Sequence, residues 1–370
     1  MMSKPKSLYI HIPFCSSICS YCDFPKILYS TNYHEKYLLA LKKEISGLKE
    51  HSFDTVYIGG GTPSVLSINE LEDLLSFINA KFKINKEYSI ECNPESLDEK
   101  KVELFCKYGV NRISLGVQTI DENHLKELNR HHTKEDVINS VKLLKKYGID
   151  NINFDFIYGL DNESIENIKN NIAFACSLDV KHISYYALQI EKGTMLYNKY
   201  KGMVQNEDKL ADYYSFICKE LRKHGYYRYE VSNFSKKGFE SKHNITYWRN
   251  KEYEACGLGA TSYVSGVRNT RTRNITNYLE GKNLLVNSIN EDILDQEFNY
   301  LMLNLRLTKG FTFSEYHRLF NKDFLNEYKN NLTKLNDDFI FSKNKIKTKP
   351  SKLYILDNIL VDLLHFKDED

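Results

Sequence analysis

Short apolar runs alternate with amphipathic segments over the first two thirds of the chain. The segments between the runs place apolar residues at helical spacing, as in residues 33–48, where Tyr37, Leu41 and Ile45 share one face. The runs are rich in β-branched and aromatic residues, as expected for strands, and cover 8–13, 55–58, 88–92, 112–117, 151–157 and 182–189. Six strand–helix repeats predict an α/β fold with a parallel sheet, either an open doubly wound sheet or a barrel.

Helix boundary signals support this reading. Ser67-x-x-Glu70 and Ser96-x-x-Glu99 have the spacing of capping boxes, and Thr133-x-x-Asp136 is a weaker version of the same pattern. Gly109 and Gly148 stand where glycine commonly ends a helix. We therefore expect helices to begin after these caps and to end near Tyr108 and Tyr147.

The pattern changes from about residue 205. A helix is predicted over 207–223 and a strand over 226–231, followed by a polar and aromatic stretch over 232–263. The tail has helical patterns at 295–306 and 314–320, a β-pair near 338–348 and an amphipathic end at 353–365. We predict three parts: 1–205 as the strand–helix domain, 206–290 as its extension, and 291–370 as a smaller α+β, winged-helix-like accessory domain.

Composition narrows the class of partner. With 51 Lys and Arg against 49 Asp and Glu, the 370-residue chain has a net charge of only +2, which argues against binding nucleic acid. No apolar run approaches the roughly 18 residues that a membrane span needs, and 1–13 lacks the apolar region of a signal peptide. We therefore predict a cytoplasmic protein without a transmembrane segment.

Three of the eight cysteines, Cys15, Cys19 and Cys22, form a C-x3-C-x2-C motif directly after the first predicted strand. Pro13 and Pro25 restrict the backbone on either side of it. A structural zinc site needs four ligands, and the chain has no second Cys/His pair with finger spacing. The motif favours an iron–sulfur cluster with three protein ligands. One iron of a four-iron cluster would then stay open to a small molecule.

Glycine and polar residues mark the ends of successive predicted strands, where a parallel α/β sheet binds its ligands. Glycine permits close approach of a ligand, and exposed amides after the second strand could hold its carboxylate or amine. A tight turn and satisfied core carboxylates would explain the same residues structurally. The marked residues are Gly59–Ser64, Glu91, Gln118, Asp155 and Ala187.

The cysteine motif resembles the signature of the radical S-adenosylmethionine (SAM) superfamily, in which the open iron holds the amino and carboxylate groups of SAM. This resemblance implies a partial (β/α)6 TIM-type barrel. From Leu8 to the tail, the chain is similar to the oxygen-independent coproporphyrinogen III oxidase family. That similarity implies that SAM is contacted near its methionine part by Tyr9, Gly60, Gly61 and Thr62. It implies polar contacts with SAM from Gln118, Arg130 and Asp155, and it places Ile157 and Ala187 around the adenine. Glu91 belongs to the same predicted site.

Two features are typical of the heme chaperones within that family. True oxidases carry a further cysteine two residues after the third cluster ligand, where this chain has Phe24. The motif His243-Asn-Ile-Thr-Tyr-Trp248 contains the single Trp of the chain and matches the chaperones. His243 is the candidate heme residue, since imidazole suits heme iron and Tyr and Trp can pack on a porphyrin. A structural His–Asn turn with an aromatic anchor is the alternative explanation of the motif, and Cys256 is an alternative ligand.

The resemblance therefore implies a heme chaperone that binds a [4Fe–4S] cluster, S-adenosyl-L-methionine and heme, and delivers heme to hemoproteins, respiratory-chain proteins among them. A coproporphyrinogen III oxidase and a non-catalytic cofactor-binding interaction protein stay as alternatives, so enzymatic turnover is left open and no catalytic residue is assigned. A homodimer and peripheral contact with a membrane are also left open.

Overall fold

The computed structural model describes residues 5–30, 33–201, 206–282 and 284–364. Its main sheet has nine strands in the order β11-β1-β4-β5-β6-β7-β8-β10-β9. The six strands that the sequence pattern predicts are neighbours in this sheet and run parallel, which confirms the α/β prediction. They are β1 (Ser7–Ile12), β4 (Ser52–Gly60), β5 (Lys83–Cys92), β6 (Arg112–Gln118), β7 (Ile152–Tyr158) and β8 (His182–Ala187).

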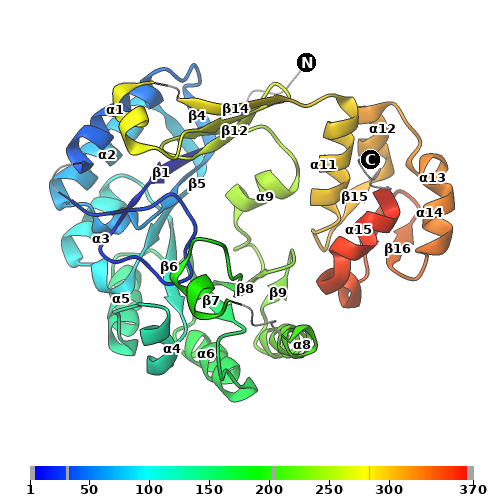
Figure 1. The fold of residues 1–370 in the computed structure, drawn as a ribbon, viewed down its shortest axis with the longest axis horizontal. Coiled ribbons are helices and arrows are strands. Elements are labelled where there is room, and N and C mark those ends of the chain that lie inside the picture. The colour runs from blue at the N-terminus through cyan, green and yellow to red at the C-terminus, as the bar shows by residue number, and fades with distance from the viewer. Residues whose placement is uncertain (1–4, 31–32, 202–205, 283, 365–370) are drawn as a thin grey trace.

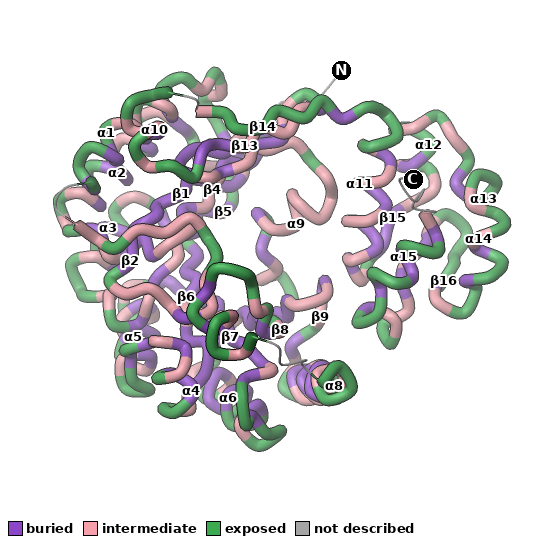
Figure 2. The backbone as a smooth tube through the Cα atoms, in the orientation of Figure 1, coloured by how far each residue is buried: buried purple, intermediate pink, exposed green. Residues whose placement is uncertain are grey.

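The sheet curves, with helices on its outer side (Figure 1). The strands β6 and β7 are buried along almost their whole length, as expected when both faces of a parallel sheet are covered. The outer helices are α1 (His34–Ser46), α2 (Ile68–Lys81), α3 (Glu99–Lys107), α4 (Glu122–Glu127), α5 (Lys134–Lys146) and α6 (Ile165–Ser177). Buried segments concentrate on the strands and on the inner faces of these helices (Figure 2).

Two of the three predicted capping boxes are confirmed. The hydroxyls of Ser67 and Thr133 accept from the third residue of α2 and α5, and the return contacts are present. The prediction at Ser96 is wrong, because Pro94 starts a 3₁₀ turn, Pro94–Ser96, and Asp98 then caps α3. Aspartate at position 98 is an equally good cap and lies directly before the helix.

The region after residue 205 is only partly as expected. The helix α8 spans the predicted Glu207–Lys223, whereas the predicted strand over 226–231 is reduced to β9 (Tyr227–Arg228). The polar stretch contains β10 (Asn233–Ser235), α9 (Lys242–Trp248), β11 (Glu254–Cys256) and β12 (Thr261–Val264). Strand β11 pairs in parallel with β1, and α9 lies on the inner side of the curved sheet, opposite the outer helices (Figure 1).

A second, antiparallel sheet follows the main one, with the strand order β12-β13-β14. Strand β13 (Val267–Arg271) is joined to β14 (Leu285–Asn290) through the short helix α10 (Ile275–Glu280). Tyr278 of α10 stacks on Tyr37 of α1. This contact attaches the extension to the outer layer of the main sheet.

The last part of the chain has its own hydrophobic core, which runs from Tyr300 to Leu363, whereas the first core runs from Leu8 to Tyr278. It combines helices with the antiparallel sheet β15-β17-β16, as the predicted α+β composition requires. Its elements are α11 (Ile293–Asn304), β15 (Phe311–Thr312), α12 (Phe313–Phe320), α13 (Phe324–Glu327), α14 (Lys329–Lys334), β16 (Phe339–Ser342), β17 (Lys345–Thr348) and α15 (Leu356–Leu364).

The first core includes Tyr213, Phe234 and Tyr278, so much of 206–290 packs with the first part of the chain. The predicted boundary at 205 and the end of the predicted segment at 365 lie outside the described residues. Within the described part of the chain, no helix is long and apolar enough to cross a membrane.

Candidate functional site

The three motif cysteines lie on one loop held by backbone pairing. Strand β2 (Phe14–Cys15) pairs in parallel with β3 (Ile27–Leu28), which closes the loop that carries Cys19 and Cys22. The Cys15 thiol is buried and the other two are half-buried. Among the described residues, no three His, Cys, Asp or Glu side chains are arranged to hold one metal ion.

Hydrogen-bond donors face two of the three sulfurs. The Thr62 hydroxyl lies 3.9 Å from Cys15 Sγ, and Arg130 Nη1 lies 3.7 Å from Cys19 Sγ. Burial raises the pKa of the Cys15 thiol to about 11 and also raises that of Cys22, so bare thiolates are unfavourable here. A cluster that carries the thiolate charge would relieve this penalty, and the donors would favour the bound thiolates.

Arg130 also holds two strand ends together. Its Nη2 donates to Asn93 Oδ1 at 2.9 Å and to the Gly116 carbonyl at 2.7 Å. Its Nε is buried and has no hydrogen-bond partner. A buried unpaired donor on a guanidinium is costly, so this atom suits an acceptor on a bound molecule.

The glycine run after β4 is shaped by close packing. A Cβ on Gly60, whose φ is +114°, would lie 2.3 Å from the His11 ring, and one on Gly61 would lie 2.7 Å from the Phe14 carbonyl oxygen. Three amides of this run have partners within the protein. The amides of Gly60, Gly61 and Thr62 already donate to Glu91, to the Ile12 carbonyl and to the Phe14 carbonyl.

Glu91 is a half-buried residue near the end of β5. It accepts from the Tyr57 hydroxyl at 2.8 Å and from the Gly60 amide at 2.9 Å. Desolvation outweighs these two donors and raises its pKa from 4.5 to about 7. Near neutral pH the group therefore exists in both protonation states, beside the glycine run and the cluster loop.

This raised pKa predicts a pH-dependent stability. The contribution of the protonated carboxyl is fully present below about pH 4.5, and it is lost as the pH rises through about 7. We expect wild-type protein to lose about 3 kcal/mol of unfolding free energy relative to Glu91→Gln between about pH 4 and pH 8. Urea unfolding of the two cluster-free proteins measures this difference. If the difference does not depend on pH, the raised pKa is wrong.

Tyr9 is connected to the cluster loop by hydrogen bonds through His11, for which the sequence predicts no role. The Tyr9 hydroxyl lies 2.9 Å from His11 Nδ1, and His11 Nε2 lies 2.8 Å from the Pro25 carbonyl oxygen. The carbonyl can only accept, so the hydrogen is on Nε2 and Nδ1 accepts from Tyr9. Residues 9 and 11 share one face of β1, a period-two signal from which this pair could have been found.

The remaining predicted SAM contacts lie on β6, β7 and β8; all are at or near the strand ends except Asp155, which is in the middle of β7. Gln118 is buried with a φ of +63°, beside a register shift between β6 and β7. Such strained positions and bulges are frequent at functional sites. Asp155 accepts from Ser114 and Asn153 at 2.7 and 2.9 Å. Ile157 and Ala187 lie on the neighbouring strands β7 and β8.

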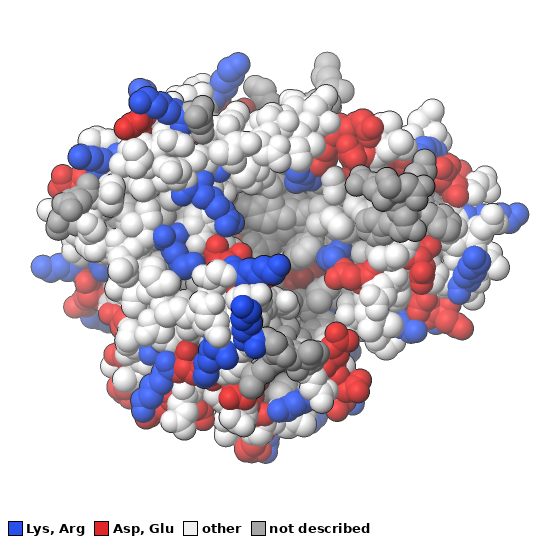
Figure 3. Space-filling model, in the orientation of Figure 1, with Lys and Arg blue, Asp and Glu red and all other residues white. Residues whose placement is uncertain are grey.

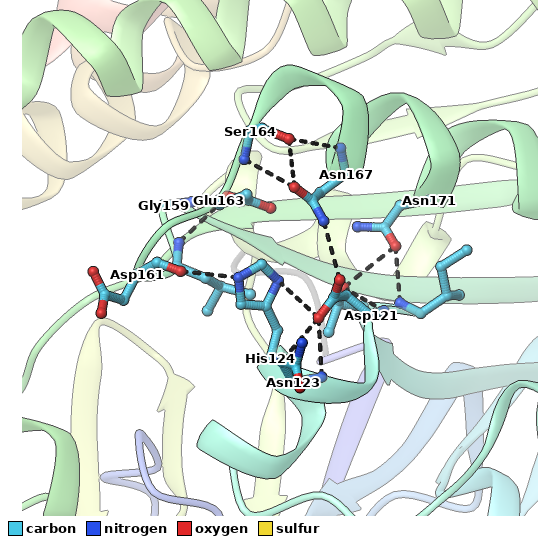
Figure 4. Close-up of polar contacts among 12 residues, drawn as sticks. Asp121, Asn123, His124, Gly159, Asp161, Glu163, Ser164, Asn167 and Asn171 are labelled. Carbon is cyan, nitrogen blue, oxygen red and sulfur yellow. Dashed lines mark hydrogen bonds and ion pairs between the residues drawn. The ribbon is translucent and has the colours of Figure 1, made fainter.

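A polar network outside these strand ends holds the loops that follow β6 and β7 (Figure 4). Asp121 caps α4 and also accepts from Asn167 of α6 at 3.2 Å. His124 contacts the Asp161 carbonyl oxygen at 2.9 Å, and the Glu163 carboxylate accepts from the Gly159 amide at 2.6 Å. The network fixes the loops next to Gln118 and Ile157 and does not include the predicted contact residues themselves.

His243 is buried within α9, with both ring nitrogens in hydrogen-bond contact. Nδ1 lies 2.8 Å from Thr55 Oγ1, and Nε2 lies 2.7 Å from the Tyr247 hydroxyl. Thr55 donates its own hydroxyl to Ser7, so it accepts from Nδ1–H, and Nε2 accepts from Tyr247. Burial lowers the pKa of His243 to about 3, which keeps the ring neutral. Direct ligation of heme iron would require these contacts to break.

The position of α9 depends on a distant carboxylate. Glu87 of β5 accepts from the amides of Lys242 and His243 at 2.9 and 3.0 Å. The Tyr57 ring stacks on His243, and Tyr9 stacks on Tyr57, so the motif helix contacts the strand ends near Glu91. The alternative heme candidate, Cys256, is fully buried in β11 at the edge of the sheet.

Comparisons with known proteins identify the family to which the chain is similar. Residues 9–175 match the family model of the radical SAM superfamily. The chain is 39% identical over 343 residues to heme chaperone HemW of Lactococcus lactis, covering 90% of both chains. It is 37% identical over 285 residues to heme chaperone HemW of Bacillus subtilis, covering 74% of this chain and 75% of the relative.

Among solved structures, the chain is similar to coproporphyrinogen III oxidase (HemN) from Escherichia coli, a radical SAM enzyme. The TM-score is 0.80 at 20% identity, over 97% of this chain and 90% of the other. At this identity the likeness shows the fold alone, and the match extends through the C-terminal part.

Proposed function

Because this chain belongs to the HemW family of heme chaperones, with a radical SAM fold, we propose that it binds a [4Fe–4S] cluster, SAM and heme, and delivers the heme to hemoproteins. The observation that carries the proposal is the cysteine loop at the strand ends, with the donors Thr62 and Arg130 facing its sulfurs. Cys15, Cys19 and Cys22 would hold the cluster. A bound cluster supplies an electron that can cleave the sulfonium of SAM.

The residues around the loop fit this pair of cofactors. Arg130 Nε has no hydrogen-bond partner within the protein and can donate to an acceptor on SAM. Gly61 has no side chain, which leaves room beside Cys15 Sγ. Gln118 and Asp155 extend polar groups along the same edge of the sheet. These contacts support the assignment of the strand ends to SAM.

The residue two positions after the cluster motif favours a heme carrier over a coproporphyrinogen oxidase. Phe24, which stands where true oxidases have a cysteine, is 61% exposed on the cluster loop and provides no thiol. The oxidase therefore stays the second candidate. Cytoplasmic location, respiratory-chain recipients, peripheral membrane contact and a homodimer stay predictions from the sequence.

We assign His243 the role of positioning Tyr247. The His243 ring holds the Tyr247 hydroxyl in place through a hydrogen bond. Glu87 accepts from the backbone of α9 and so positions the helix that carries both residues. In this arrangement the aromatic end of the motif, Tyr247 and Trp248, is the part that meets a ligand.

One anaerobic experiment tests the proposal. After reconstitution of the cluster, heme binding and decarboxylation of coproporphyrinogen III are measured on the same preparation, with and without SAM. We expect one-to-one heme binding, transfer to an apo-hemoprotein, and no decarboxylation. Decarboxylation with multiple turnovers would show that the protein is an oxidase and contradict the assignment as a heme carrier. Absence of both heme binding and decarboxylation would favour an interaction protein.

A further inference from the structure

A cavity of about 560 Å³ lies between the main sheet and the C-terminal part of the chain. The space-filling view is hollowed between these two parts (Figure 3). The walls come from the end of β8, from the turn before β10, from α9, and from the C-terminal segments around residues 306 and 353–357. The volume lies within the range of small-molecule sites, which is about 300–1,000 Å³.

The walls combine aromatic and aliphatic surface with several polar side chains, among them Glu230, Asn233 and Asn244. Tyr186, Tyr247 and Trp248 line the side formed by the main sheet and α9, and the Tyr186 side chain is 40% exposed although it lies at a strand end. Asn233 lines the same side, is only 3% exposed, and has a buried Oδ1 without a hydrogen-bond partner. Aromatic surface beside an unpaired buried acceptor indicates a site for a mainly apolar ligand with polar substituents.

Arg306 brings a cation to the opposite side. Its Nη1 donates to the Met302 carbonyl at 2.8 Å, which fixes the side chain, and its Nη2 pairs with the Asp357 carboxylate. The Asp357 side chain is 79% exposed, so this pair contributes little to stability. A carboxylate on a ligand can therefore take the place of Asp357 on a guanidinium that is already held in position.

We propose that this cavity is the heme site, with the macrocycle against Trp248 and a propionate on Arg306 in place of Asp357. The inference rests on the proposed carriage of heme and adds its location and its carboxylate partner. Heme would then be held between the two parts of the chain. Binding and release would both involve the C-terminal domain.

The single Trp of the chain is the reporter for the test, because Trp248 lines the cavity. Hemin and hemin dimethyl ester are titrated into the full chain while Trp fluorescence and the heme absorption band are followed. We expect both ligands to quench Trp248. Arg306→Gln should weaken hemin about 10-fold, equal to about 1.4 kcal/mol, and leave the ester unchanged. Asp357→Asn should strengthen hemin binding.

Arg222→Gln is the matched control, since it removes the same charge from a residue that packs over Tyr227, away from the cavity lining. Heme binding without quenching of Trp248 would overturn the location. Equal losses for hemin and the ester in Arg306→Gln, or an unchanged hemin affinity, would overturn the carboxylate contact. Failure of wild-type protein to bind hemin at all would instead contradict the proposed function.

Discussion

Replacing Cys19 by Ala is expected to abolish a stable [4Fe–4S] cluster and to leave the fold intact. Cys19 is half-buried, and the loop around it is anchored independently of its thiol. The Ser20 amide donates to the Leu128 carbonyl at 3.1 Å, and the Ser20 hydroxyl donates to the Glu127 carbonyl at 2.7 Å. Loss of one of three protein ligands leaves two thiolates for a cubane, which is too few to hold it against exchange.

Iron and sulfide per chain after anaerobic reconstitution measure this effect, and the melting temperature of the cluster-free protein reports the fold. Cys106→Ala serves as the control, because Cys106 is exposed on α3 and stands outside the motif. We expect full iron content in the control and less than about a tenth of it in Cys19→Ala. A full cluster in Cys19→Ala would show that the ligand assignment is wrong.

The second large effect is expected for His243→Ala. The substitution removes a buried ring that stacks on Tyr57, and it strips partners from Thr55 and Tyr247. A cavity and lost hydrogen bonds of this kind cost about 3 kcal/mol of unfolding free energy. We also expect impaired heme transfer with the cluster retained, since Tyr247 would no longer be held at the cavity wall.

Tyr247→Phe separates positioning by His243 from ligation of iron. If His243 acts through Tyr247, the heme spectrum and the transfer rate should change in the same way in both variants, and their effects should not add. If His243 is the iron ligand, only His243→Ala should alter the axial-ligand features of the spectrum. Unchanged transfer in both variants would return the whole motif to a structural role.

The sequence was sufficient for the features that depend on local signals. Alternating runs located the six parallel strands, and the caps at Ser67 and Thr133 located two helix starts. At Ser96 the same spacing gave a wrong helix start, because Pro94 begins a 3₁₀ turn and Asp98 is the N-cap of α3. Cys15, Cys19 and Cys22 were found together because they share one short loop.

The features that the sequence did not indicate depend on long-range contacts. The helix α9 is short and rich in β-branched and aromatic residues, and its start is stabilised by Glu87, more than 150 residues away. The three-residue strand β11 is too short to show the alternation of apolar and polar residues that predicts a strand. Its position beside β1 depends on contacts between residues far apart in the sequence. The satisfied amides of the glycine run likewise became visible only once β1 and the cluster loop were in place.

The pairing of β1 with β11 has a consequence for biosynthesis. Strand β1 leaves the ribosome long before β11, so one of its edges gains its partner only after Cys256 has been made. Until then it presents unpaired backbone groups of the kind that promote association between nascent chains. The wall of the proposed heme site is completed later still, because it includes Asp357. The pairing of β2 with β3 that closes the cysteine loop can therefore form well before the proposed heme site exists.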